Sequence, residues 1–323
     1  MTKCLICNKN EKVKFLEEYK VEIKEDKDYF EGAKIYRCDD CDFSFVNPMP
    51  SEKKLNEFYK NIYRSKNRPP YWITEDYDER KKFYLNDKNL SYLLYITTLI
   101  DIKKIKNVFD FGGGDGDLAY SLKKNFQQLN LFCLENDSHC LKILDDRGYT
   151  NFENINDINK KFDLIVTTHS LEHLTDINSI FSKFNEILNS NGYIYFEVPN
   201  CPQEYWNGRP YDGPHLLFYT KKSMEKIAEL HGLKFINFSF SCYSFSNDHK
   251  YQREAQNIYE KNKANQSFFW LKNLLKKIIP KRLIYLRREY MQTQKNKDDT
   301  KMGWFVNNTG ENCYIRGILQ KNK

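Results

Sequence analysis

The sequence predicts an α/β fold with a mostly parallel sheet, and two observations support this prediction. Short apolar runs alternate with segments of helical spacing from residue 108 onward. Such alternation is typical of parallel strands joined by right-handed crossover helices. The first run, 108–111, breaks into the glycine-rich turn 112–116 and then into a helix beginning at Asp117. A strand, a tight turn and a helix in this order let backbone N–H groups approach a ligand closely.

The strands and helices of this sheet follow from the period of the apolar residues. Strands are expected at 108–111, 131–135, 151–155, 162–168, 192–198, 234–245 and 313–319. Helices are expected at 117–125, 138–147, 177–188 and 220–231. The last strand follows the turn-forming residues 307–310, and we expect it to return antiparallel beside 234–245.

The residues before the sheet have a different pattern. Aromatic and polar residues alternate at 19–23 and 42–46, which predicts short strands. Ser51 is a suitable N-cap for a helix that runs to residue 59. Residues 61–76 are aromatic without a clear period, and we interpret them as a loop that packs over a substrate. Helical spacing returns at 79–100 and leads into the sheet.

The sequence therefore predicts four parts. They are a small β module at 1–50, a helical connector or lid at 51–105, a core at 106–245 and 303–323, and a basic helical insertion at 246–302.

Composition narrows the class of protein. The chain has 323 residues and a net charge of +7, which is modest for its length and counts only weakly toward nucleic acid. Residues 1–7 do not form a charged and apolar leader, and no apolar stretch approaches the ~20 residues that span a bilayer. Cytoplasmic residence is the default expectation.

Four of the nine cysteines form two close pairs, Cys4-x-x-Cys7 and Cys38-x-x-Cys41. In a chain without a signal sequence, paired C-x-x-C knuckles indicate a tetrahedral zinc site, and the remaining single cysteines read as small hydrophobes. A redox site of the thioredoxin kind needs only one pair near a βαβ unit, whereas both pairs here precede the α/β pattern. We predict that Cys4, Cys7, Cys38 and Cys41 bind structural Zn²⁺.

The glycine-rich turn does not fit a dinucleotide fingerprint. That fingerprint needs G-x-G-x-x-G, but Gly112 and Gly114 are followed at the third position by Asp117, and Gly116 comes one place early. Asp110-x-Gly112-x-Gly114-x-Gly116 instead resembles motif I of the class I S-adenosylmethionine-dependent methyltransferases. The fold that the resemblance implies is a Rossmann-like methyltransferase sheet with a reversed last strand.

This resemblance implies a set of residues that bind S-adenosylmethionine. Asp110 would engage the ammonium of the cofactor, directly or through water. Glu135, after the second strand, would accept hydrogen bonds from the ribose hydroxyls. Asn156 and Asp157 are equal candidates for the adenine amino group. The remaining cofactor residues implied are Gly112, Gly114, Gly116, Asn136 and Thr168.

The fourth strand leads into Thr167-Thr168-His169-Ser170-Leu171-Glu172-His173. This segment resembles the Leu-Glu-His loop of methyltransferases that act on small molecules, and the Asn/Asp-Pro-Pro-aromatic motif of amino-group enzymes acting on DNA bases is missing. Histidine suits proton removal at neutral pH. His169, at the strand end, is the preferred base, with His215 as the second candidate. Glu172 and His173 belong to the same predicted site, although His173 is expected to have a structural role.

Residues 206–220 resemble the loop that precedes the last crossover helix in related methyltransferases. That position would bring Arg209 and Tyr211 over the methyl group, where Arg209 pairs with a substrate phosphate and Tyr211 stacks on a base or sugar. The alternative is that Pro210 and Pro214 only shape a packed loop. Arg64, in the aromatic loop, is the third predicted substrate residue.

The chain is most similar to bacterial methyltransferases that carry an N-terminal C-x-x-C ribbon and modify sugars, nucleotide sugars or surface polysaccharides. The resemblance implies methyl transfer to a sugar hydroxyl with a histidine base, and leaves oxygen, nitrogen and carbon acceptors open. One alternative is an RNA methyltransferase, which the acidic segment 17–31 disfavours. The other is a non-catalytic scaffold that binds S-adenosylmethionine.

The insertion has a basic amphipathic centre at 267–290. Such a helix fits an anionic membrane surface or a partner. The preferred interpretation is that its apolar stripe packs on its own sheet or on a second subunit of a homodimer.

Overall fold

The computed structural model describes residues 2–21, 23–63, 77–82, 84, 87–206, 214–241 and 314–322. The chain divides into two compact units, of which the first comprises 1–239 and 314–323 and the second comprises 240–313. Nearly all described residues belong to the first unit. The insertion at 246–302 with its basic centre 267–290 lies outside the described residues, so its prediction stays untested.

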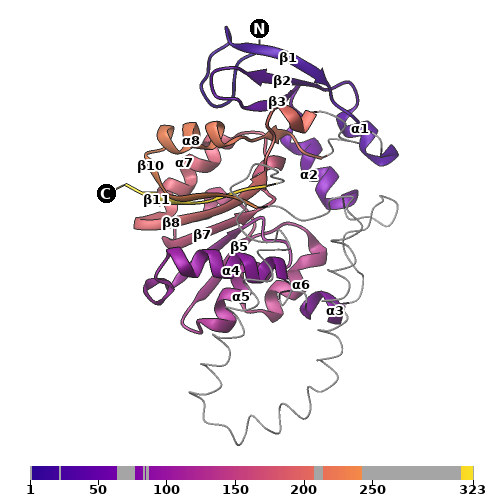
Figure 1. Ribbon diagram of the computed structural model, residues 1–323. Helices are drawn as coiled ribbons and strands as arrows, with labels where there is room; N and C mark the ends of the chain where they lie inside the picture. The colour runs from indigo at the N-terminus through magenta and orange to yellow at the C-terminus, as the bar shows by residue number, and fades with distance from the viewer. Residues whose placement is uncertain are drawn as a thin grey trace, which may run out of the picture. The chain divides into compact units, whose positions relative to one another are not determined.

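A seven-stranded sheet forms the centre of the first unit, with the order β10-β11-β8-β7-β4-β5-β6 (Figure 1). The pairs from β6 through β8 are parallel, whereas β11 pairs antiparallel with β8. The predicted mostly parallel sheet with a reversed last strand is confirmed. The strands are β4 Asn107–Phe111, β5 Asn130–Leu134, β6 Tyr149–Phe152, β7 Phe162–Thr168, β8 Leu188–Pro199, β10 Leu233–Ser241 and β11 Tyr314–Lys321.

Helices cover both faces of this sheet, with α4, α5 and α6 on one face and α7 and α8 on the other (Figure 1). Their bounds are α3 Tyr77–Lys82, α4 Asp87–Leu99, α5 Asp117–Asn125, α6 Ser138–Asp146, α7 Ile177–Ile187 and α8 Lys221–Leu230. Side chains cap three of them, since Asp137, Asp176 and Thr220 each accept from a backbone N–H of the first turn. The apolar faces of α4 and α5 enter the buried core around β4 and β5.

Two elements next to the central sheet differ from the sequence prediction. The helix expected at 79–100 consists of two helices, α3 and α4. The third strand begins at Tyr149 instead of residue 151, because Gly148 takes a positive φ of 74° directly after α6 and turns the chain back into the sheet. Tyr149 is then buried against the glycine loop.

The N-terminal residues form a separate four-stranded sheet with the order β1-β2-β3-β9. Its strands are β1 Val13–Glu18, β2 Lys34–Cys38, β3 Ser44–Asn47 and β9 Leu217–Phe218, and the helices beside it are α1 Lys27–Phe30 and α2 Glu52–Asn61. The strand expected at 19–23 is wrong, because Tyr19 ends the hairpin by donating its N–H to Ala33 and packs its ring on Phe30. Ser51 caps α2 as predicted.

The pairing of β3 with β9 joins the two sheets of the first unit. The N–H of Val46 also donates to the carbonyl of Leu216 over 3.0 Å. Residues before the last crossover helix are therefore held by the N-terminal module. Among the described residues, no helix is long and apolar enough to span a membrane.

Candidate active site

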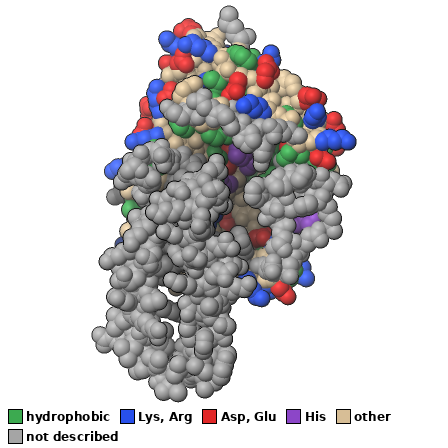
Figure 2. All heavy atoms as spheres, turned by 45° about the vertical axis from the view of Figure 1, so that its right-hand side comes forward, with side chains coloured by type: hydrophobic (Ala, Val, Ile, Leu, Met, Phe, Trp, Pro, Cys, Tyr) green, Lys and Arg blue, Asp and Glu red, His purple; other side chains and the backbone are tan. Residues whose placement is uncertain are grey.

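A cavity of about 700 Å³ lies at the carboxyl ends of β4, β5 and β7. Parallel α/β sheets bind ligands at this edge, and the volume falls within the roughly 300–1,000 Å³ of small-molecule sites. Figure 2 shows histidine side chains above acidic side chains in a recess of the surface. The predicted site residues that line the cavity are Gly112, Glu135, Asn136, Asn156, His169 and His173.

The glycine loop is shaped by close contacts that exclude side chains. Gly112 has a φ of 63°, and a Cβ atom there would lie 2.5 Å from Oγ of Ser170. The same hydroxyl donates to the carbonyl of Gly112 over 2.9 Å, which ties this loop to the end of β7. Gly116, with a φ of 72°, is the N-cap of α5. The loop therefore needs glycine at both positions.

Glu135 is fixed by two backbone donors. The N–H of Gly114 donates to Oε2 over 2.8 Å, and the N–H of Asp137 donates to Oε1 over 2.9 Å. Each carboxylate oxygen accepts more than one hydrogen bond, so Glu135 retains acceptor capacity on the cavity side. This arrangement suits a ligand with neighbouring hydroxyl groups.

Asp110 lies beneath the loop and is only 3% exposed. Burial, together with the charges of Asp117 and Glu135, raises its pKa to about 7, although the Tyr149 hydroxyl 3.5 Å away lowers it. The carboxyl group therefore supports the loop from behind, and its predicted contact with an ammonium group stays a prediction. Four further predicted residues are described but do not line the cavity: Gly114, Gly116, Asp157 and Thr168.

His169 ends β7 in a backbone conformation that is unusual for a non-glycine residue, with a φ of 52°. Its Nδ1 lies 3.5 Å from Oε1 of Glu172, and its Nε2 lies 3.2 Å from Oε1 of Glu197. The side chain is 25% exposed and lines the cavity. Strained residues cluster at functional sites, and His169 has a carboxylate beside each ring nitrogen.

Glu197 is a site residue that sequence reasoning missed. It is buried, and Arg316 donates to its Oε2 from Nε over 2.9 Å and from Nη2 over 2.7 Å. The Tyr92 hydroxyl donates to its other oxygen over 2.5 Å. Burial alone raises the pKa of Glu197, but Arg316 and His169 outweigh it and hold the pKa well below its usual range. An acid inside the apolar run of β8 was the available signal.

Glu172, His173 and His215 lie together, and His173 lines the cavity. The rings of His173 and His215 are 5.0 Å apart, and Glu172 is 1% exposed. Burial raises the pKa of Glu172, but the neighbouring histidines lower it to about 2. Burial lowers the pKa of His215 to about 4, so its imidazole is neutral at neutral pH.

Helix α2 supplies Tyr59, which sequence reasoning missed, and Tyr63 after this helix belongs to the segment 61–76 that was expected to pack over a substrate. Tyr59 lines the cavity and packs its ring 5.8 Å from that of His173, and Tyr63 lies 6.3 Å from the same ring. Tyr59 and Tyr63 therefore pack against His173 at the wall of the cavity. The predicted substrate residues Arg64, Arg209 and Tyr211 lie outside the described residues.

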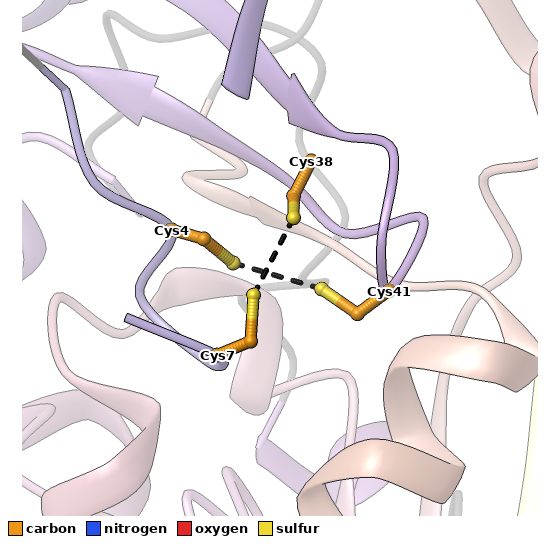
Figure 3. A group of neighbouring side chains, drawn as sticks. All are labelled: Cys4, Cys7, Cys38 and Cys41. Carbon is orange, nitrogen blue, oxygen red and sulfur yellow. Dashed lines mark hydrogen bonds between the residues drawn. The ribbon is translucent and has the colours of Figure 1, made fainter. Parts of the chain in front are cut away.

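The four predicted zinc ligands come together in the N-terminal module (Figure 3). The Sγ atoms of Cys4 and Cys41 are 3.6 Å apart, and those of Cys7 and Cys38 are 3.5 Å apart. Tetrahedral Zn–S bonds of about 2.3 Å place sulfur atoms about 3.8 Å apart. The donor set and its spacing therefore fit one zinc ion with a closed coordination shell.

Comparison with known proteins gives a family match and several similar solved structures. Residues 78–237 match the sequence profile of a family described as "Methyltransferase domain". A search of curated proteins finds no match. Similar solved structures include a SAM-dependent methyltransferase from Thermotoga maritima, with 13% identity, coverage of 76% of this chain and 95% of that chain, and a TM-score of 0.45.

Two further structures are similar at the same level. A methyltransferase from Clostridium acetobutylicum has 12% identity, coverage of 74% and 93%, and a TM-score of 0.45. An O-methyltransferase of a polyketide synthase multienzyme from Brevibacillus brevis, bound to S-adenosyl-L-homocysteine, has 13% identity, coverage of 76% and 75%, and a TM-score of 0.42. Likeness of this extent says nothing about the substrate of the present chain.

Proposed function

We propose that this chain, whose residues 78–237 match a methyltransferase domain family, is a class I S-adenosylmethionine-dependent methyltransferase that methylates a hydroxyl oxygen of a sugar or nucleotide-linked sugar. One observation carries the proposal. A single cavity is lined by Gly112 and Glu135, which follow β4 and β5, and by His169 and His173, which follow β7. A cofactor bound at the glycine loop would therefore present its methyl group toward histidines.

The reaction is an in-line displacement. The acceptor oxygen forms a bond to the methyl carbon, the bond from that carbon to the sulfonium sulfur breaks, and S-adenosylhomocysteine leaves. The hydroxyl proton passes to a base. Alignment of the oxygen with the methyl group supplies much of the rate enhancement, and proton removal adds typically 10²–10⁴-fold.

We propose His169 as the base, with Glu172 and Glu197 stabilising the imidazolium that forms. Each ring nitrogen already faces a carboxylate at 3.5 and 3.2 Å, so the neutral ring has to turn one nitrogen toward the acceptor. His215 is the second candidate, because its lowered pKa leaves the imidazole neutral at neutral pH. Both candidates share the neighbour Glu172.

The sugar class rests on the resemblance of the whole chain to ribbon-bearing sugar methyltransferases and on the polar rim of the cavity. Asn56, Lys60 and Lys183 line the cavity beside the aromatic residues of α2. Aromatic surfaces and amide or ammonium donors suit a ligand with many hydroxyl groups. Zinc in the Cys4 site has a structural role in this proposal, because four thiolates leave no open position.

The test is mass spectrometry of the purified full chain incubated with S-adenosylmethionine and a panel of nucleotide-linked sugars. We expect S-adenosylhomocysteine and one sugar that is heavier by a methylene, with the methyl on oxygen by NMR. A reaction without acceptor corrects for cofactor hydrolysis. Cofactor binding without any methylated sugar contradicts the sugar class, and a methyl on carbon or nitrogen contradicts the oxygen acceptor.

A further inference from the structure

We propose that Glu172, His173 and His215 form a second metal site, which takes a divalent transition cation such as Zn²⁺ at the acceptor end of the cavity. One ligand atom from each residue lies within 4.8 Å of the other two. Bonds of about 2.1 Å from zinc to nitrogen and oxygen put ligand atoms about 3.4 Å apart. A bound cation would therefore draw the ligand atoms together by up to about 1.4 Å.

The carboxylate of Glu172 is buried and faces imidazole groups without accepting a hydrogen bond from any described residue. It is 1% exposed, and neither oxygen has a hydrogen-bond partner within the part of the chain that the structure describes. The Nδ1 atom of His169 lies 3.5 Å from Oε1. Native proteins pair such groups with donors or with metals, because an unpartnered buried charge is costly. A divalent cation bound there would pair with the buried Glu172 carboxylate.

The second ligand, His173, is oriented as metal-bound histidines are. Its Nδ1 lies 3.3 Å from the carbonyl oxygen of Pro214. A proton on Nδ1 that donates to this carbonyl leaves the lone pair on Nε2, the nitrogen that would bind the cation. Histidine ligands almost always use their other nitrogen in this way.

The backbone holds the two ligand segments together before any cation binds. The N–H of Leu216, the residue after His215, donates to the carbonyl of Glu172 over 2.7 Å. The hydroxyl of Tyr219 donates to the carbonyl of Leu171 over 2.9 Å. Ligands on both segments are thus positioned by contacts that do not depend on the metal.

Two histidines and one glutamate are a ligand set of open zinc sites, which keep a fourth position for water or substrate. His173 lines the cavity, so the open position would face the acceptor. A hydroxyl bound there would lose its proton more readily. This last role rests on the proposed function, whereas cation binding itself does not.

The experiment measures metal binding by the full chain with its cysteine-bound zinc retained. Metal content is counted by mass spectrometry, and Zn²⁺ and Co²⁺ are then titrated by calorimetry without cofactor. We expect one further equivalent in the wild type. Glu172→Gln and His215→Ala are expected to lower its affinity at least ~10-fold, while His231→Gln, a change outside the cavity, leaves it unchanged. Cobalt at this site is expected to show no thiolate charge-transfer band.

Two results would overturn the site: no further equivalent in the wild type, or equal affinity in Glu172→Gln. The second result would make Glu172 only the counter-ion of His169. Circular dichroism checks that the variants fold, and His215→Ala provides a second variant if Glu172→Gln does not. Cofactor binding is measured on the same samples, so failure of the methyltransferase proposal is seen separately from failure of the metal site.

Discussion

The cysteine cluster of the N-terminal module and the cluster of Glu172, His173 and His215 differ in how they are built. The first has four identical ligands on two C-x-x-C knuckles, and its sulfur atoms already lie at metal-binding distances. The second has three ligands of two kinds beside a cavity. A closed shell stabilises a fold, whereas an incomplete shell leaves a position for chemistry. The comparison teaches that the first cluster should control stability and the second activity.

The two clusters are also connected. The N–H of Val46 in β3 donates to the carbonyl of Leu216, and the N–H of Leu216 donates to the backbone carbonyl of Glu172. The module that the cysteines hold together therefore also holds the segment that carries His215. Loss of the cysteine site should consequently disturb the histidine site, while the reverse should not occur.

The largest effect is expected for Cys38→Ser with Cys41→Ser, which removes two thiolates. Zinc binding contributes on the order of 10 kcal/mol to the folding of small zinc domains, so residues 4–47 are expected to lose their zinc and to exchange amide hydrogens rapidly. Metal analysis and hydrogen exchange measure this. Cys201→Ala, at a buried single cysteine, serves as the control and should keep its zinc. Slow amide exchange in residues 4–47 without bound zinc would contradict the view that the cysteine cluster controls stability.

Arg316→Met is expected to have the next largest effect, because it leaves Glu197 charged and buried without its partner. Breaking a buried ion pair in this way costs about 3–5 kcal/mol. Urea unfolding gives the change in the free energy of unfolding. Lys226→Met is the control, since its exposed pair with Glu229 is worth about 1 kcal/mol or less. Equal losses of unfolding free energy in both variants would show that the ion pair of Arg316 and Glu197 does not stabilise the site.

His169→Asn is expected to lower turnover by at least ~10²-fold and to leave the affinity for S-adenosylmethionine unchanged. Asparagine tolerates the positive φ of this position, so the change tests the imidazole and not the backbone. Turnover and cofactor binding are measured on the same preparation, with His231→Asn as the control. Wild-type turnover in both His169→Asn and His215→Ala would remove a histidine base from the mechanism.

The smallest effect is a pH dependence from Asp110, whose pKa in the folded chain is about 7 against ~3.9 when unfolded. The folded state holds this proton more tightly, so the stabilisation is complete below about pH 4 and is lost as pH rises through 7. Between pH 6 and pH 8 this amounts to about 1.4 kcal/mol.

Asp110→Asn removes this titration, so its stability relative to the wild type should rise over the same interval. Thermal unfolding of both proteins at pH 6 and pH 8 measures the difference. A constant difference would show that Asp110 is already ionised in the folded chain at pH 6.

Local patterns in the sequence predicted most of the fold. The glycine turn, the Ser51 cap and α5 at Asp117–Asn125 lie where expected, because each depends on the preferences of neighbouring residues. The strand expected at 19–23 failed for the opposite reason. Tyr19 alternates like a strand residue, but its contact with Phe30 ends the hairpin there.

The candidate site divides in the same way. The spacing of the C-x-x-C pairs predicted the cysteine site. The position of Glu135 at the end of a strand predicted that it belongs to the cavity. Glu197 and Arg316 could not be paired, since 119 positions separate them and neither belongs to a short motif. The sequence around Tyr59 likewise predicts only a helix. Nothing in that pattern indicates that the helix packs against His173.

The sequence by itself determined the α/β class, and it predicted a ligand loop at Gly112–Gly116 and a metal site at the cysteine set. These depend on backbone conformation and on ligands a few residues apart. Only the tertiary structure decided that His169 lies between two carboxylates and that His215 lies beside Glu172 and His173. Such contacts arise where β7, β8 and the segment before α8 meet. Burial strengthens the interactions between charged groups there, because little water screens them.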